Sequence, residues 1–129
     1  MSKHAIIVIK NDDNEYLQYY DDRWNSYLFL NCKLEDNDEN IVKKYVSDIL
    51  KVDVNKINCK YISDKIHTKF SESAKQEKEY HHYFYKVIIN SEFNINNNYK
   101  FFSYDELKND KRIREVNSDI VEFIKEFNL

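Results

Sequence analysis

The feature that most restricts the fold is a short apolar run near the start of the chain, Ala5 to Lys10 (AIIVIK). A continuous run of β-branched residues is typical of a strand that is buried on both faces. The apolar part, Ala5 to Ile9, is far shorter than the roughly 20 residues that a membrane helix needs. We therefore expect a buried strand in a soluble globular protein without a membrane partner.

Further extended segments follow this strand. The turn residues Asn11 to Asn14 predict that Ala5–Lys10 forms a hairpin with the next segment. A second, longer hairpin is expected around the polar loop 71–78, which we predict to be the most mobile part of the chain. The expected strands after the first are Tyr16–Tyr20, Ser26–Asn31, Lys60–Phe70, Tyr80–Ile89 and Tyr99–Phe102.

Three segments carry helix signals. Asn37 or Asp38 is placed to cap a helix that runs to about Leu50, with acidic residues favourably near its positive end. Ser103 to Glu106 has the capping-box pattern that starts a helical turn. A last helix is expected over about 118–127, where Ile120, Phe123, Ile124 and Phe127 recur at helical spacing and would pack on the sheet.

Length and composition limit the classes of protein. The chain has 129 residues, which predicts a single domain over residues 1–129. A formal charge of −3 and a pI near 5.8 oppose binding to a nucleic-acid backbone. The two cysteines, Cys32 and Cys59, have no close pairing and are expected to be free thiols in a reducing compartment. We therefore predict a cytoplasmic protein.

Read in order, the elements are a strand, a hairpin, a strand into an acidic loop, a helix, a long hairpin, a strand with a helical turn, and a closing helix. This order resembles the Nudix hydrolase superfamily over essentially the whole chain. The resemblance is clearest in AIIVIKNDDNEYLQYYD, FLNCKLEDNDENIVKKYVSDILKV and YKFFSYDELKND. It implies an α/β fold, an α/β/α sandwich with a mixed, curved sheet. It also implies hydrolysis of a nucleoside diphosphate linked to another group, with magnesium or manganese as the cofactor.

The family's signature motif is degenerate in this chain. Its first glycine falls on Cys32 and its first glutamate on Asp38. With one residue deleted from the spacer, the later Arg-Glu and Glu-Glu pairs fall on Lys44-Tyr45 and Asp48-Ile49. The final glycine falls on Lys51. Charge survives at Asp38, Lys44 and Asp48, but two metal-binding glutamates are replaced by a phenol and an alkyl group, which cannot bind a hard divalent cation.

The helix bearing these substitutions is apolar over about half of its circumference. Val42, Val46 and Leu50 form the row expected to face the core. Ile41, Tyr45 and Ile49 form a second apolar row where the family carries metal ligands. This second row could bind a ligand, a protein partner or a second copy of the chain in a homodimer. The loop glycine position, occupied by Cys32, would adopt a left-handed conformation only at a cost.

The remaining acidic residues allow two interpretations. Glu35, Asp38 and Asp48, with a general base such as Glu79 from the segment 72–79, are the candidates for a rebuilt catalytic metal site. Charge runs of this kind usually face solvent and cap helices, and this interpretation is favoured.

Two further groups of residues are candidates for binding. Arg23, Trp24 and Tyr27 lie just before the acidic loop, where a planar group could stack and a phosphate could meet the arginine. Packing of these aromatic residues on the sheet is the simpler alternative. His81 and His82 are adjacent on a strand and point to opposite faces, and no close-spaced ligand pair joins them to His67, Cys32 or Cys59. We therefore expect no zinc site.

The sequence favours a Nudix-fold pseudoenzyme that binds or senses a nucleotide-like small molecule or a protein partner. Its predicted ligand-binding residues are Arg23, Trp24, Tyr27, Tyr45 and Ile49. On this interpretation no metal cofactor is expected. The alternative is a divergent metal-dependent pyrophosphohydrolase that uses magnesium or manganese. The sequence does not identify the ligand.

Overall fold

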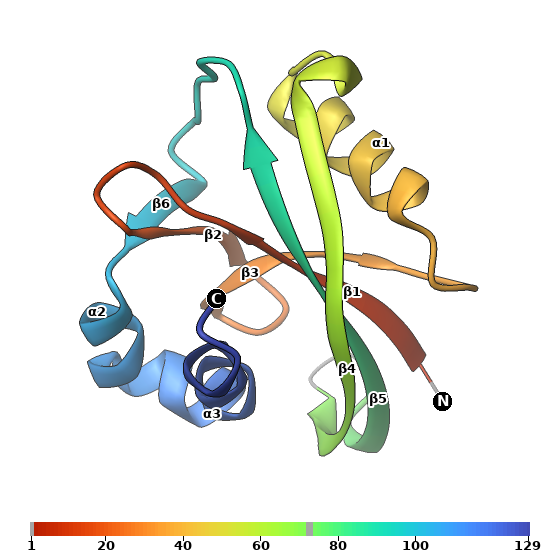
Figure 1. The fold of residues 1–129 in the computed structure, drawn as a ribbon. Coiled ribbons are helices and arrows are strands. Elements are labelled where there is room, and N and C mark those ends of the chain that lie inside the picture. The colour runs from red at the N-terminus through yellow and green to blue at the C-terminus, as the bar shows by residue number, and fades with distance from the viewer. Residues whose placement is uncertain (1, 72–73) are drawn as a thin grey trace.

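A computed structural model describes residues 2–71 and 74–129, and Figure 1 shows a curved sheet with helices on both faces. The strands are β1 (Ser2–Ile9), β2 (Tyr16–Asp21), β3 (Ser26–Lys33), β4 (Ile57–Ser71), β5 (Gln76–Ile89) and β6 (Tyr99–Phe102). The helices are α1 (Glu39–Leu50), the short 3₁₀ helix η1 (Val54–Lys56), α2 (Tyr104–Asn109) and α3 (Lys111–Glu126). The predicted α/β/α sandwich with a mixed, curved sheet is confirmed.

The sheet has six strands in the order β4-β5-β1-β3-β2-β6. β1 pairs parallel with β5, and the other neighbouring pairs are antiparallel. The predicted hairpin between the first two strands is wrong, because β3 lies between them. Within residues 2–71 and 74–129, an isolated bridge from Lys10 to Tyr16 is what remains of that pairing. The predicted β4–β5 hairpin is confirmed. Because β4 ends at Ser71 and β5 begins at Gln76, the connection between them is shorter than expected.

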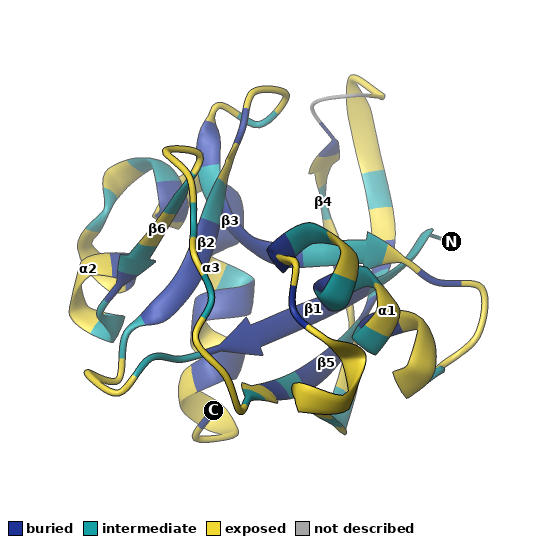
Figure 2. Cartoon of the chain, turned by 90° about the horizontal axis from the view of Figure 1, so that it is seen from above, coloured by how far each residue is buried: buried dark blue, intermediate teal, exposed yellow. Residues whose placement is uncertain are grey.

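Successive side chains of β1 point to opposite faces of the sheet and divide the core into two layers, as expected for a strand buried on both faces. Ala5, Ile7 and Ile9 pack toward α1 and its core row Val42, Val46 and Leu50. Ile6 and Val8 pack on the other face against α3 residues that include Ile120, Phe123 and Ile124. Figure 2 shows β1 buried along most of its length, between helices whose outer faces are exposed.

The helix ends follow their capping residues. Asp38 is the N-cap of α1, with its side chain accepting a hydrogen bond from the backbone N–H of Asn40 at 2.8 Å. Ser103 and Glu106 form the predicted capping box of α2. Lys51 ends α1 in the left-handed region with φ 57°, at the position that the resemblance assigns to a glycine. Cys32 avoids that region because it lies within the extended strand β3.

Helix α3 begins earlier than predicted. It starts at Lys111, capped by Asp110, and is interrupted at Asn117, whose φ of −133° and ψ of 26° are not helical. The predicted segment 118–127 therefore corresponds to its second half. Phe127, expected on the packed face, is 40% exposed. None of the helices among the described residues is both long enough and apolar enough to cross a membrane.

Candidate functional site

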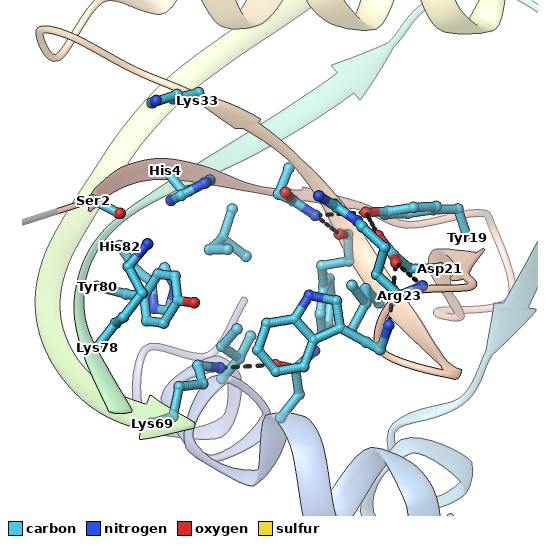
Figure 3. A pocket seen from close by; sticks show the side chains of 17 residues that line it. Ser2, His4, Tyr19, Asp21, Arg23, Lys33, Lys69, Lys78, Tyr80 and His82 are labelled. Atoms are coloured by element: carbon cyan, nitrogen blue, oxygen red, sulfur yellow. Dashed lines mark hydrogen bonds and ion pairs between the residues drawn. The ribbon is translucent and has the colours of Figure 1, made fainter. Parts of the chain in front are cut away.

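A cavity of about 310 Å³ lies between α3 and the sheet, on the face opposite α1. Figure 3 shows His4 from β1 and Lys78, Tyr80 and His82 from β5 on one side, with Asp21 and Arg23 on the other. Its full lining is Ser2, His4, Ile6, Tyr19, Asp21, Arg23, Trp24, Leu28, Phe29, Asn31, Lys33, Lys69, Lys78, Tyr80, His82, Asn117 and Ile120. Its volume falls within the range of small-molecule sites, roughly 300–1,000 Å³.

Buried Asp21 organises the β2–β3 loop that forms one wall. Its carboxylate accepts hydrogen bonds from the backbone N–H groups of Arg23 at 2.8 Å and Trp24 at 3.3 Å. It also accepts from the Tyr19 hydroxyl at 3.0 Å and from the Arg23 guanidinium at 3.2 Å. Burial acts to raise the pKa of Asp21, but the hydrogen bonds from Arg23 and Tyr19 hold it below its ordinary value. Asp21 is therefore an ionised anchor for both Arg23 and Trp24.

Helix α3 fixes the other side of the same loop. The Arg112 guanidinium donates to the backbone carbonyls of Trp24 at 2.5 Å and Asn25 at 3.2 Å. Lys69 reaches from β4 to the interruption in α3, where its ammonium donates to the Asn117 side-chain oxygen at 3.0 Å. The same ammonium lies 6.0 Å from the centre of the Trp24 ring. Trp24 thus lies between the half-buried Lys69 ammonium and a backbone that Arg112 holds in place.

The cavity has a positive electrostatic environment. Four basic side chains line it, Arg23, Lys33, Lys69 and Lys78, against the single carboxylate of Asp21. In the described part of the chain, Lys33 and Lys78 form no ion pair. The pKa of His4 is lowered by burial and then by the charges of Lys33, Lys78, Arg23 and Lys69. Such a site favours an anion.

The helix face that the sequence singled out lies elsewhere. Tyr45 and Ile49 are half-buried and pack against the α1-side core together with Cys32, Cys59 and Tyr99. Burial raises the pKa of Tyr45 to about 12. Neither Tyr45 nor Ile49 lines the cavity described above. The second apolar row is therefore largely covered by the chain itself, and only Ile41, 42% exposed, remains well accessible.

Two of the four candidate carboxylates have a local role, and the other two are exposed. Asp38 caps α1, while Asp48 forms an exposed ion pair with Lys44 at 3.2 Å, one helical turn away. Glu35 and Glu79 are exposed. Of the segment 72–79, residues 72 and 73 lie outside the described residues.

Among residues 2–71 and 74–129, one group of three His, Cys, Asp or Glu side chains is close enough to share an ion: His67, His82 and Asp119. Within the same two ranges, the four candidate carboxylates form no such group. With neutral Tyr45 and Ile49 on the helix, these residues do not fit a magnesium or manganese centre, which requires converging oxygen ligands.

The structure separates the predicted ligand-binding residues. Arg23 and Trp24 line the cavity, whereas Tyr27 packs against Phe102, with ring centres 5.0 Å apart, and against Tyr20. Sequence reasoning missed the contributions of Asp21, Lys69 and Asn117. An Asp that directly precedes a polar turn is a recognisable signal for loop anchoring. Lys69 and Asn117 gave no such signal, because their proximity depends on tertiary packing.

Comparison with solved structures places this geometry in a known architecture, although no family model and no curated protein sequence matches the chain. The chain is similar to a C. elegans Ap4A hydrolase, with 14% identity, a TM-score of 0.62 and coverage of 99% of this chain and 96% of that one. It is also similar to a NUDIX-family hydrolase from Clostridium perfringens, with 14% identity, a TM-score of 0.60 and coverage of 97% and 94%. A Nudix hydrolase from M. smegmatis matches with 4% identity, a TM-score of 0.54 and coverage of 99% and 88%. At these identities the likeness establishes a shared fold.

Proposed function

We propose that this chain, which has the Nudix fold, is a non-catalytic member of that architecture. It binds a nucleotide-like, phosphate-bearing small molecule in the cavity between α3 and the sheet. The observation that carries the proposal is the gathering of Trp24 and four basic side chains around one cavity. An aromatic ring can stack on a base, and guanidinium and ammonium groups can neutralise a phosphate.

The absence of catalysis is supported by the chemistry of the α1 face. Phosphoryl-transfer sites of this type use a divalent cation to stabilise charge and to activate water. Tyr45 and Ile49 offer no hard ligand, and Asp48 is exposed to solvent with Lys44 as its partner. We infer that ligand binding persists on the α3 face without the metal chemistry on the α1 face.

The proposal is tested with the intrinsic fluorescence of the protein, because Trp24 is the only tryptophan in the sequence. The chain is titrated with ADP, ATP, a dinucleoside polyphosphate, pyrophosphate and adenosine, and calorimetry provides an independent affinity. We expect saturable fluorescence changes with the nucleotides and weaker binding of pyrophosphate or adenosine alone. The absence of saturable binding to every compound would refute the proposal.

A matched pair of double variants locates the binding. Lys33→Gln with Lys78→Gln removes two lining charges that form no described ion pair. The nucleotide affinity should fall about tenfold or more, since each charge-assisted contact contributes on the order of 1 kcal/mol. Lys44→Gln with Lys108→Gln makes the same change in net charge on exposed faces of α1 and α2 and should leave the affinity within about twofold. Equal losses in the two variants would show that only the overall charge matters.

A further inference from the structure

Two buried histidines and an aspartate meet beside the cavity. His67 on β4 and His82 on β5 have their Nδ1 atoms 2.8 Å apart, and His67 Nδ1 lies 3.6 Å from Asp119 Oδ2 on α3. His67 is 8% exposed and His82 is 4% exposed. The ligand atoms of the three side chains all lie within 4.8 Å of one another. Three elements that are distant in sequence thus bring three metal-binding groups together.

From this geometry we propose that His67, His82 and Asp119 form a binding site for a divalent transition-metal ion such as zinc. Two imidazole nitrogens and one carboxylate oxygen are the donor set that zinc and similar ions accept, and a three-ligand protein site leaves one position open. The site lies on the α3 face of the sheet, away from α1. The inference does not depend on the proposed nucleotide ligand.

Two of the three ligand separations need only a small adjustment to hold an ion, and the third, between His82 and Asp119, lies within 4.8 Å. With metal–ligand bonds of about 2.0–2.1 Å, two ligands in a tetrahedral site lie roughly 3.3–3.4 Å apart. The 3.6 Å separation of His67 Nδ1 and Asp119 Oδ2 is close to this value. The 2.8 Å separation of the histidine nitrogens is a hydrogen-bond distance, and the two rings would have to part by about half an ångström. Asp119 is about three-quarters buried at the side chain, so its carboxylate retains some freedom to turn toward the rings.

The two buried rings are joined by a hydrogen bond, and their protonation state is compatible with metal binding. Burial lowers the pKa of His82 to about 2, and burial also lowers the pKa of His67. Both imidazoles are therefore neutral near pH 7, as metal ligands must be. In the ion-free protein the Nδ1–H of one ring donates a hydrogen bond to Nδ1 of the other. For an ion to bind both Nδ1 atoms, that proton would move to Nε2 of its own ring, so both imidazoles stay neutral and no net proton is released.

Lys69 is the group that opposes an ion at this position. Its ammonium lies 3.2 Å from Asp119 Oδ2 and 3.4 Å from Oδ1. The carboxylate has two oxygens, so Lys69 can keep Oδ1 while Oδ2 binds the ion, and the Asn117 oxygen at 3.0 Å still accepts from the ammonium.

The test uses Co²⁺ as a spectroscopic probe on the full chain, followed by competition with Zn²⁺. Tetrahedral Co²⁺ absorbs visible light far more strongly than octahedral Co²⁺, and thiolate ligation adds a separate near-ultraviolet band. We expect one Co²⁺ per chain with an intense visible spectrum, no thiolate band, and displacement by one equivalent of Zn²⁺. No uptake, a weak octahedral spectrum or a thiolate band from Cys32 or Cys59 would overturn the assignment.

Variants locate the ion within the chain. Loss of an outer-shell partner typically weakens metal binding by roughly 10- to 100-fold. Asp119→Asn and His82→Asn each remove a proposed ligand and should weaken Co²⁺ binding by more than this. His81→Asn is the matched control, since His81 is the neighbouring residue on β5 but pairs with Asp64 at 2.5 Å on the other face. It should leave the spectrum unchanged, and loss of the spectrum in this variant would contradict the proposal. If circular dichroism shows that His82→Asn does not fold, Asp119→Asn decides the outcome, because Asp119 lies on α3 and is less buried than His82.

Discussion

The two faces of the sheet carry opposite chemistry. On the α1 face, apolar and phenolic side chains surround Tyr45 and Ile49, and burial raises the pKa of Cys32 to about 11 and that of Cys59 to about 12. On the α3 face, basic side chains line a cavity, and burial and neighbouring cations lower the pKa of His4. The first environment excludes charge, whereas the second concentrates positive charge.

In our proposal, this difference separates binding from catalysis within one fold. A phosphate-bearing ligand needs cations and a stacking surface, which the α3 face provides. Metal-assisted hydrolysis needs converging carboxylates, whereas Tyr45 and Ile49 on the α1 face pack against the core. Our proposal therefore places ligand binding on one face of the sheet and no metal chemistry on the other.

The largest expected effect is on the packing that positions α3. Phe84 on β5 is fully buried and stacks on Phe123 of α3, with ring centres 3.7 Å apart. Phe84→Ala should lower the free energy of unfolding by about 3–5 kcal/mol, as measured by urea denaturation. Phe127→Ala, at a position that is 40% exposed and also stacks on Phe123, should cost less than about 1 kcal/mol. Equal costs would show that the α3 face is not packed as described.

A smaller effect is expected when charge is returned to the apolar α1 face. Ile49→Glu places a carboxylate in a half-buried site among core residues and should destabilise the protein by about 2 kcal/mol or more. The control is Ile41→Glu on the same helix, where the side chain is 42% exposed and lies in the first turn. That change should stay within about 0.5 kcal/mol, because a carboxylate is favourable there. If both variants were equally stable in denaturant titrations, the second apolar row would be open rather than packed.

The thiols on the α1 face should react slowly. Their raised pKa values leave only a small fraction of each thiol as the reactive thiolate at pH 8. Alkylation of Cys32 and Cys59 by iodoacetamide should be roughly 10- to 100-fold slower than that of a free cysteine, since higher intrinsic nucleophilicity offsets part of the loss. Mass spectrometry measures the rates, and the urea-unfolded chain provides the reference. Rates that match the unfolded chain would contradict a charge-excluding face.

The smallest effect is predicted for the surviving charges of the degenerate motif. Lys44 and Asp48 form an ion pair whose side chains are 78% and 63% exposed. Lys44→Gln should change the stability by less than about 0.5 kcal/mol. Thermal denaturation in low salt checks this value, and a loss above about 2 kcal/mol would show that the pair has a role beyond the surface.

Much of the fold was predictable from local patterns. The strand residues of β1, the Asp38 cap and the Ser103–Glu106 capping box were all recognised, because each signal lies within a few residues. The β1–β2 hairpin was wrong because β3 takes the place beside β1, and such non-local pairing leaves no local signature. The start of α3 was missed because the interruption at Asn117 breaks the helical spacing of its apolar residues.

The candidate site was less predictable than the fold. Arg23 and Trp24 were identified because they lie just before the acidic loop in the Nudix-like order of elements. Lys69 and Asn117 meet only through packing. His67 and His82 were considered together as possible zinc ligands, but a shared site was not expected because they are not closely spaced in the sequence. They become diagonal neighbours because of the register of the β4–β5 hairpin, which shifts between Tyr61 and Ser63. A shift of one residue would place His67 on the opposite face.

The central claim is that this Nudix-fold chain binds its ligand without hydrolysing it. The most direct measurement is turnover of the same nucleotides that bind near Trp24, followed by chromatography with magnesium or manganese present. The account predicts saturable binding with no product above the protein-free rate. Metal-dependent turnover that is abolished by Asp48→Ala would contradict it.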